Sequence, residues 1–247
     1  MGRDGAVHRP GDHAVTFQIG ESPRQHAVAD AADLVAQGIS VRVAPYEDVA
    51  ALRQAFAGVQ RLLLVSGSEV GKRALQHANI VAAAKSAGVD FIAYTSLLHA
   101  DSSGLSLAEE HRATEALLAA SGIGHALLRN GWYWENYTSQ FESARNTGCI
   151  YGAAGTALVS GAARNDYAEA AAEVIVRPGQ EGKVYELAGA PALDYPGIAA
   201  AIGAVIGSDV TYTDLSEADL VSALEQTGMP NPVAQFVAAM DTAIAHG

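Results

Sequence analysis

The chain has 247 residues, of which 15 are Lys or Arg and 27 are Asp or Glu, so its formal net charge is −12. Hydrophobic residues make up 49% and charged residues 17%, which is typical of a packed globular protein and not of a disordered one. The negative charge repels phosphates, so we expect no nucleic-acid partner. Cys149 is the single cysteine, which excludes an internal disulfide and a thiolate zinc site. No apolar run reaches about 18 residues, so we expect no membrane span and a cytoplasmic protein.

Short β-branched runs alternate with longer helical patterns in the first half of the chain, which is typical of βαβ units and a parallel sheet. We expect strands at 14–19, 39–44, 61–66, 91–96 and 125–129, and helices at 46–56, 70–87 and 106–120. Gly88 is expected to end the second of these helices, and Ser106 with Glu109 has the spacing of a capping box at the third.

The alternation loosens beyond Asn130. We expect further helices at 132–146, 166–176, 195–206, 216–226 and 232–245, and short strands at 156–160, 183–187 and 210–213. Ser216 and Asp219 are spaced as an N-terminal helix cap. We therefore expect an α/β core over 1–130, with 1–29 atypical, and a smaller lobe over 131–247 that is interwoven with the core.

Three stretches carry a resemblance to a known family: LLLVSGSEVGKR at 62–73, FIAYTSLLHAD at 91–101 and LLRNGWYWENYTS at 127–139. Together with RNDYAEAA at 164–171 and GKVYELAG at 182–189, they resemble the NmrA-like, atypical branch of the short-chain dehydrogenase/reductases, above all its type 2 NAD(P)H:quinone oxidoreductases. The resemblance implies an α/β, Rossmann-like, doubly wound parallel sheet with a small C-terminal substrate lobe. It also implies NAD(P)H-dependent reduction of quinones or similar planar acceptors by hydride transfer.

The resemblance implies a site as well. NADPH is the implied cofactor, with NADH as the alternative, and a small-molecule quinone is the implied substrate. The implied cofactor-binding residues are Ser66, Glu69, Val70, Gly71, Thr95, Ser96, Asn136, Tyr137, Thr138, Ser139, Gln140, Phe141 and Tyr167. Arg24 is the residue that would contact a 2′-phosphate.

Each of these stretches also has a plainer interpretation. Residues 66–71 can form an ordinary strand-to-helix loop with Ser68 as N-cap, since short Gly/Ser loops are common. The aromatic residues 132–134 can fill the junction between lobes, although three in a row cannot all face inward. We expect Tyr133 and Asn136 to be catalytic, because Tyr133 offers a phenol and a flat ring that can stack on a planar quinone, and Asn136 offers a hydrogen-bond donor and acceptor. His99 is interpreted more simply as a surface residue.

The catalytic tetrad of ordinary short-chain dehydrogenases is absent from the sequence. Those enzymes pair a serine, here at the position of Ser96, with Tyr-x-x-x-Lys on the next helix. That helix instead carries His111 and Glu115, which are expected to form an exposed polar pair. No residues have metal-ligand spacing, so we expect no metal site, and Cys149 is expected to be a small buried side chain.

No G-x-G-x-x-G or G-x-x-G-x-x-G motif occurs in the chain, although a pyrophosphate-binding turn needs such glycines. Two hypotheses follow. Residues 1–29 come from a shifted reading frame or a misassigned start, or the chain is a genuine NmrA-like redox-cofactor sensor or other degenerate, non-catalytic dinucleotide-binding protein. The sequence leaves the oligomeric state open, with a homodimer as one option.

Overall fold

The computed structural model describes residues 14–15, 32, 34–69 and 71–246. The chain divides into two compact units, each with its own hydrophobic core. Unit 1 comprises residues 1–96, 109–128 and 173–185, and unit 2 comprises residues 97–108, 129–172 and 186–247. Most of the strand expected at 14–19, together with Arg24 and Val70, lies outside the described residues.

A four-stranded sheet carries the core of unit 1. Its strands are β3 (Arg61–Leu64), β4 (Phe91–Leu97), β5 (Gly124–Asn130) and β7 (Val184–Leu187), in the order β3-β4-β5-β7. β3 and β4 are parallel, with Leu62 opposite Ile92 and Leu64 opposite Tyr94. A separate two-stranded sheet pairs β1 (Ala14–Val15) with β2 (Ser40–Val41), also in parallel. These pairings confirm the parallel α/β arrangement that the sequence predicts.

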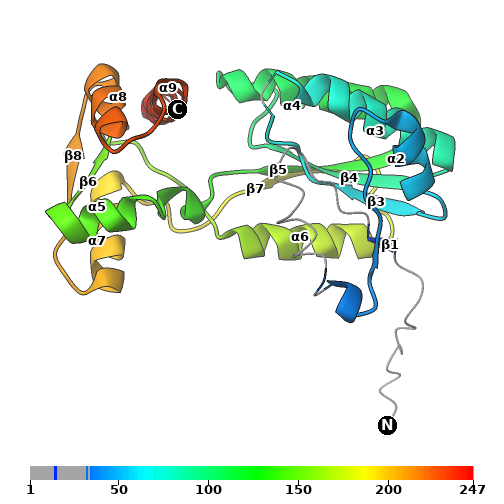
Figure 1. The fold of residues 1–247 in the computed structure, drawn as a ribbon, viewed down its shortest axis with the longest axis horizontal. Coiled ribbons are helices and arrows are strands. Elements are labelled where there is room, and N and C mark those ends of the chain that lie inside the picture. Colours follow the sequence, from blue (N-terminus) through cyan, green and yellow to red (C-terminus); the bar gives the residue numbers. More distant parts are fainter. Residues whose placement is uncertain (1–13, 16–31, 33, 70, 247) are drawn as a thin grey trace, which may run out of the picture. The chain divides into compact units, whose positions relative to one another are not determined.

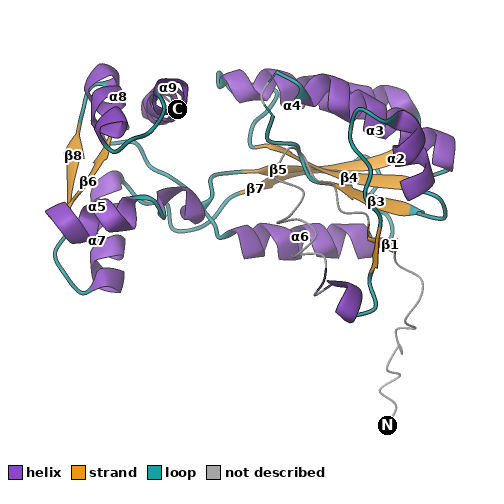
Figure 2. Ribbon diagram, viewed as in Figure 1, coloured by secondary structure: helices purple, strands orange, loops and turns teal. Residues whose placement is uncertain are grey.

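Three helices cover one face of this sheet in Figures 1 and 2: α2 (Val49–Ala55), α3 (Arg73–Ala87) and α4 (Ser106–Ser121). The C-terminal end of α6 (Arg164–Val176) lies at the other face, where the Arg61 guanidinium donates to the carbonyl of Ile175 at 2.5 Å. As predicted, α3 ends at Gly88, whose φ of 80° is left-handed and therefore favours glycine. Leu52 and Leu118 are at most 1% exposed, so the layer between helices and sheet is closely packed.

Unit 2 contains a second parallel sheet, in which β6 (Cys149–Gly152) pairs with β8 (Thr211–Asp214). Besides the N-terminal part of α6, unit 2 contains the helices α5 (Gln140–Thr147), α7 (Tyr195–Ile206), α8 (Glu217–Gln226) and α9 (Asn231–His246). Ser216 caps α8 by accepting the Asp219 N–H at 3.2 Å, as its spacing predicts. Ile150 and Tyr195, at 0% and 1% exposed, lie at the centre of the core of this unit.

The prediction of one helix over 132–146 is wrong, because the structure has two shorter helical segments there. Residues 134–137 form a single 3-10 turn, and α5 begins only at Gln140. The cause is distant in sequence: Tyr133 forms a parallel bridge with Ala162, and Trp132 O and Trp134 N–H are both hydrogen-bonded to Ala162. These bonds hold residues 132–134 extended, so a helix cannot start there.

The strand predicted over 156–160 is also wrong. It is reduced to one antiparallel bridge between Val159 and Leu193. A strand that was not predicted, β6, lies a few residues earlier and begins at Cys149. The thiol donates to Ile150 O at 3.3 Å in a buried position, which confirms that Cys149 is a buried side chain.

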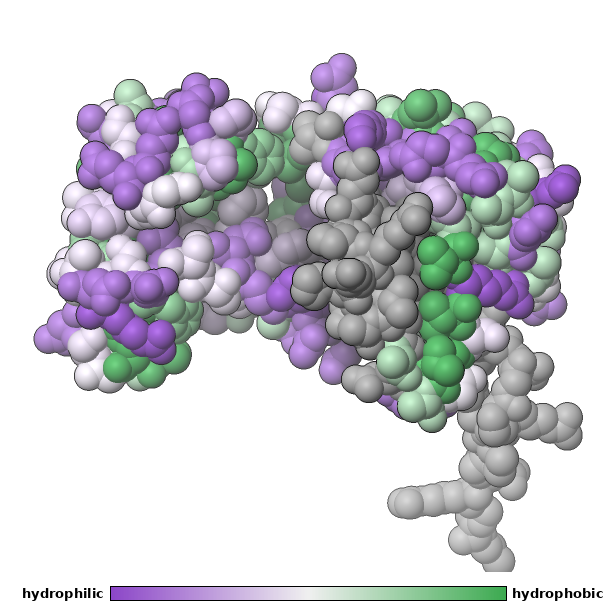
Figure 3. Space-filling view, in the orientation of Figure 1, coloured by the Kyte–Doolittle hydropathy of each residue, from purple (hydrophilic) through white to green (hydrophobic). Residues whose placement is uncertain are grey.

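Hydrophobic side chains also contribute to the surface. Val43 and Leu75 of unit 1 are 62% and 68% exposed, and Figure 3 shows hydrophobic surface on this unit. Single exposed apolar residues of this kind are ordinary in folded proteins. Within the described residues, no helix combines the length and the apolar character needed to cross a membrane.

Candidate cofactor and substrate site

In unit 1 the candidate site is the loop 66–71 between β3 and α3, of which the structure describes residues 66–69 and 71. Ser66 and Gly67 are half-buried and Ser68 is exposed. The loop lies at the carboxyl end of a parallel strand, which is where ligands bind in open α/β sheets. The Ser66 N–H donates to Thr95 Oγ1 at 2.8 Å, so the structure brings together two of the predicted site residues.

Side chains of α3 and α4 form hydrogen bonds with the backbone of this loop. The Gly67 N–H donates to His77 Nε2 at 3.2 Å, and the Gly67 carbonyl accepts from Arg73 Nε at 2.8 Å. The Gly71 N–H donates to Glu110 Oε1 at 2.9 Å, and Glu110 Oε2 forms an ion pair with Arg73 Nη1 at 2.8 Å. Gly71 has a φ of 86°, which a residue with a side chain adopts only with strain. The loop is therefore held near both of its ends.

β4 carries two polar pairs, of which one is buried and one is partly buried. Ser96 donates from Oγ to Glu115 Oε1 at 2.6 Å, and the Tyr94 hydroxyl lies 2.7 Å from His111 Nδ1. The predicted exposed pair of His111 and Glu115 is therefore wrong: His111 is 6% exposed, and both residues turn toward partners on β4. Burial lowers the pKa of His111 to about 4, so its ring is neutral at pH 7.

In unit 2 the candidate site consists of residues that follow β5. The ring of Tyr133 packs edge-on against that of Tyr167, with ring centroids 5.1 Å apart. Asn130 donates from Nδ2 to the Tyr133 hydroxyl at 3.3 Å, and Tyr167 donates to the Trp132 carbonyl at 3.2 Å. A side chain at Gly131 would bring its Cβ to 3.2 Å from the Tyr167 hydroxyl. Only glycine therefore fits this approach without displacing its neighbours.

The three consecutive aromatic residues, 132–134, have different neighbours. Each of them is partly exposed. Trp132 and Trp134 pack against the hydrophobic core of unit 2, whereas Tyr133 packs on Tyr167. This division agrees with the expectation that three in a row cannot all face inward, and it leaves Tyr133 as the one with a polar environment.

The predicted residues that follow Tyr133 divide between surface and core. The exposed ones are Asn136, Thr138 and Ser139. Tyr137 is 7% exposed and donates to the Tyr195 hydroxyl at 3.4 Å, and burial raises its pKa to about 12. Gln140 donates to a backbone carbonyl of β6 at 2.9 Å, and Phe141 packs against the core of unit 2.

His99 lies in a loop of unit 2 with its side chain 65% exposed. Its φ of 51° is left-handed, and its N–H donates to Glu186 Oε2 at 2.9 Å. Glu186 also accepts from Arg129 Nη1 at 2.8 Å, so its carboxylate links the His99 backbone and the Arg129 side chain to β7. The structure agrees with the interpretation of His99 as a surface residue.

Several residues at these sites were not predicted from the sequence: His77, Glu110, Thr114 and Asn130. A signal for Asn130 existed, because it is a polar residue at the end of an apolar strand, where ligands bind in parallel sheets. Glu110 and Thr114 lie four residues apart and so on one face of α4, but such a polar pair normally marks an exposed face. Only the fold shows that this face is turned inward.

Buried polar atoms without partners lie beside each of the two candidate stretches. Within the described part of the chain, three buried side-chain atoms have no hydrogen-bond partner: Gln76 Oε1 in unit 1, and Asn130 Oδ1 and Trp132 Nε1 in unit 2. Gln76 Oε1 borders the loop, since a Cβ on Gly67 would lie 3.5 Å from it. Buried polar atoms without partners are rare in native proteins and are often satisfied by a ligand or an ion. Over the same residues, no cluster of three or more His, Cys, Asp or Glu could hold a metal ion.

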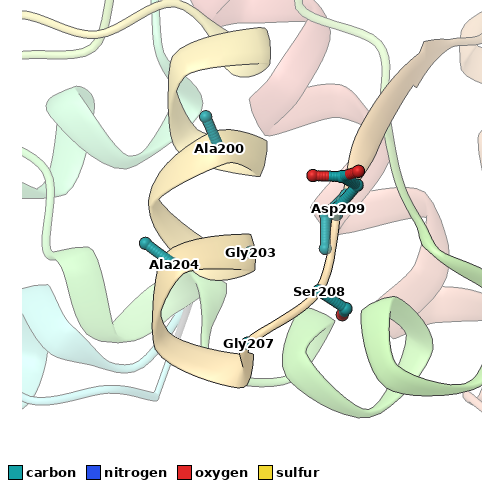
Figure 4. Close-up of a pocket in the computed structure, with 7 residues that line it drawn as sticks. Ala200, Gly203, Ala204, Gly207, Ser208 and Asp209 are labelled. Atoms are coloured by element: carbon teal, nitrogen blue, oxygen red, sulfur yellow. The ribbon is translucent and has the colours of Figure 1, made fainter.

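A hollow in unit 2 lies between the end of α7 and the start of β8, and Figure 4 shows its lining. The lining residues are Ala200, Gly203, Ala204, Gly207, Ser208, Asp209 and Val210. Most of them are small or apolar and only Asp209 is charged, so the hollow offers few groups for specific recognition. It contains none of the predicted site residues.

A parallel sheet whose strand β3 leads into small, hydrogen-bonded residues is the arrangement of Rossmann-like dinucleotide-binding proteins. The comparison with known proteins agrees with this class. The chain belongs to the NmrA-like family, whose sequence model matches residues 8–246.

The chain is 53% identical to quinone oxidoreductase 2 of Escherichia coli over 219 residues, which cover 89% of this chain and 77% of that protein. The crystal structure of the NADPH-dependent quinone oxidoreductase QOR2 of Escherichia coli, complexed with NADPH, matches over the same shares with a TM-score of 0.85. Triphenylmethane reductase of Citrobacter sp., complexed with NADP(H), is 34% identical with a TM-score of 0.85, over 89% of this chain and 78% of that one. The predicted resemblance and the predicted fold class are thereby confirmed.

Proposed function

We propose that this chain reduces quinones or similar planar acceptors, with NADPH as the hydride donor and NADH as the alternative. The observation that carries the proposal is the 53% identity with quinone oxidoreductase 2 of Escherichia coli over 89% of the chain. Support for NADPH comes from the complexes of two similar proteins, one with NADPH and one with NADP(H).

Unit 1 is proposed to bind the cofactor along the loop 66–71 and the end of β4. When bound, NADPH supplies the hydride. Ser66 and Ser68 offer hydroxyl groups, and Gly67 offers backbone without a side chain. Ser96 gives its one hydroxyl hydrogen to Glu115, so it can accept a hydrogen bond from a ligand but not donate one. The other cofactor contacts proposed in unit 1 are Glu69, Val70, Gly71 and Thr95. In unit 2 the family resemblance also implies cofactor contacts at Asn136, Tyr137, Thr138, Ser139, Gln140, Phe141 and Tyr167.

Unit 2 is proposed to bind the quinone, with Tyr133 and Asn136 as catalytic residues. Asn130 Nδ2 donates to the Tyr133 oxygen at 3.3 Å, which leaves the hydroxyl hydrogen of Tyr133 free to point at a carbonyl oxygen. A hydrogen bond to that oxygen stabilises the negative charge that develops on it during reduction. Asn136, which is exposed, is proposed as a second donor to the acceptor.

The test measures binding and turnover separately. Titration of the purified chain with NADPH, followed by nicotinamide fluorescence, gives the Kd, and quinone-dependent loss of nicotinamide absorbance gives kcat. We expect both binding and turnover in the wild type. Tyr133→Phe is expected to lower kcat at least about tenfold, as removal of one stabilising donor does, with the Kd for NADPH unchanged. Tyr151→Phe, a half-buried tyrosine of the same unit, is the matched control. Wild-type kcat in Tyr133→Phe would contradict the assignment of Tyr133.

A redox-cofactor sensor without turnover is the second candidate function. The observation that favours it is the absence of a glycine-rich fingerprint from the chain. The same two measurements separate the candidates, because a sensor binds NADPH but does not oxidise it when quinone is added.

The proposal includes a cytoplasmic location, where NADPH is available and where the lone thiol of Cys149 remains reduced. A homodimer is the assembly we propose to test first. Light scattering on the purified chain distinguishes it from a monomer.

A further inference from the structure

A buried chain of hydrogen bonds in unit 1 runs from α4 through α3 to the loop 66–71. Thr114 and His77 are both 0% exposed. His77 Nδ1 lies 2.9 Å from Thr114 Oγ1, and His77 Nε2 lies 3.2 Å from the Gly67 nitrogen. Burying polar groups between two helices is costly unless every group is satisfied, so the direction of each bond matters.

Both ends of this series of hydrogen bonds determine which nitrogen of His77 carries the hydrogen. Thr114 gives its one hydroxyl hydrogen to the carbonyl of Glu110 at 3.0 Å, so toward His77 it can only accept. His77 Nδ1 must therefore carry the hydrogen. At the other end the Gly67 N–H can only donate, so His77 Nε2 must be bare. The two ends select the same tautomer.

The surroundings of His77 keep its ring neutral, which this tautomer requires. Burial, together with the positive charge of Arg73, lowers the pKa of His77 to about 3. The rings of Tyr46 and Tyr94 stand edge-on to the imidazole, with centroids 6.4 Å and 5.5 Å away. A neutral ring accepts from Gly67 across the whole physiological pH range.

We propose that Thr114 and His77 are positioning residues that preset the loop backbone at Gly67 for its ligand. Thr114 fixes the tautomer of His77, and His77 in turn holds the Gly67 amide, while Arg73 holds the Gly67 carbonyl. A loop that is already ordered loses less entropy when a ligand binds, so the ligand binds more tightly. That the ligand is NADPH rests on the function proposed above.

Thr114→Val removes the hydroxyl group of the side chain but keeps its β-branched shape. The methyl group fills nearly the same volume, but His77 Nδ1 loses its acceptor. With its Nδ1–H unpaired, the ring can shift away from Gly67, and once that bond is lost nothing fixes the hydrogen on Nδ1. Thr114→Ser retains the hydroxyl and is expected to behave as the wild type. Thr242→Val is the matched control, because Thr242 Oγ1 makes the same bond to the carbonyl four residues earlier, at 3.0 Å, in α9 of unit 2.

The first measurement is made on the ligand-free chain. Long-range proton–nitrogen NMR correlations of the imidazole distinguish a bare nitrogen from a protonated one. We expect a bare His77 Nε2 in the wild type and in Thr114→Ser and Thr242→Val, and a protonated or averaged Nε2 in Thr114→Val. Hydrogen exchange of the Gly67 amide is expected to accelerate only in Thr114→Val. A protonated Nε2 in the wild type, or unchanged Gly67 exchange in Thr114→Val, would overturn the proposal.

The second measurement is the titration with NADPH. Loss of one buried hydrogen bond corresponds to a Kd about 2 to 13 times higher in Thr114→Val. The kcat at saturating NADPH is expected to stay at the wild-type value, because His77 does not touch the reacting atoms. Equal Kd values for Thr114→Val and the wild type would overturn the role in binding. A wild-type chain that binds no NADPH would refute the proposed function, and the ligand-free measurements would still decide whether Thr114 and His77 position the loop.

Discussion

Lowering the pH from 6.5 to 4.5 is expected to destabilise the protein through two buried histidines of unit 1, His77 and His111. They are 0% and 6% exposed, and burial lowers their pKa values to about 3 and about 4. In the unfolded chain both rings are in water and titrate at about 6.5. The folded and unfolded states therefore differ in the number of protons that they bind over this pH interval.

The sign and size of the effect follow from this difference. Above pH 6.5 both states are neutral at His77 and His111, so the two residues contribute their full stability there. Below pH 6.5 the unfolded chain takes up protons that the folded chain does not, and the free energy of unfolding falls by about 1.4 kcal/mol per pH unit for each residue. Over two pH units the loss is about 5 kcal/mol for the pair, which is a large part of the stability of a typical domain.

The assay is urea unfolding of the wild type and of the double variant His77→Gln/His111→Gln at several pH values between 7.5 and 4.5. The double variant is expected to be less stable at neutral pH, but to lose about 5 kcal/mol less on acidification. Carboxylates titrate in both proteins, so their contribution cancels in the comparison. Leu52→Ala, which removes a core side chain that is 1% exposed, is the control and should lower stability equally at every pH. Equal pH slopes in the wild type and the double variant would refute the reasoning.

Three further predictions concern single side chains. Glu110→Ala is expected to lower the free energy of unfolding by about 3 kcal/mol or more, since it leaves the buried Arg73 guanidinium without its ion-pair partner; adding Arg73→Met should restore part of this loss in urea unfolding. Gly131→Ala is expected to cost about 1–3 kcal/mol, seen as a lower Tm, because its Cβ would lie 3.2 Å from the Tyr167 hydroxyl. Burial raises the pKa of Asp241, so its contribution to stability is present at acidic pH and is lost as the pH rises; Asp241→Asn should lose less stability than the wild type as the pH rises above about 4 in the same assay.

The alternating strands and helices of unit 1 could be predicted because their signals are local. β3 and β4 are short apolar runs, as expected of parallel strands that are covered on both faces. Gly88 directly follows the apolar pattern of α3, and its left-handed φ of 80° is a property of that residue alone. Signals of this kind need no knowledge of which elements meet in the fold.

The break after Tyr133 could not be predicted, because its cause lies nearly 30 residues further along the chain. The bonds between residues 132–134 and Ala162 keep this segment extended, although its composition suits a helix. The same limit applies to Tyr167, whose contact with Tyr133 joins α6 to the residues after β5. The family resemblance implied a cofactor contact for Tyr167, and its phenol suggested a role for Tyr133, but periodicity alone pointed to neither.

The inward face of α4 is the clearest case of a site that only the fold reveals. It presents four polar residues: Glu110, His111, Thr114 and Glu115. Their partners are, in the same order, the Gly71 amide, the Tyr94 hydroxyl, the His77 ring and the Ser96 hydroxyl. Each pair is separated by 17 to 39 residues in sequence, so the polar spacing by itself predicts a solvated face. A shift of the helix by one turn would separate all four groups from their partners, and two of them, His111 and Thr114, are buried. We infer that the polar face sets the register of α4 against β4 and α3, and thereby the position of the loop 66–71.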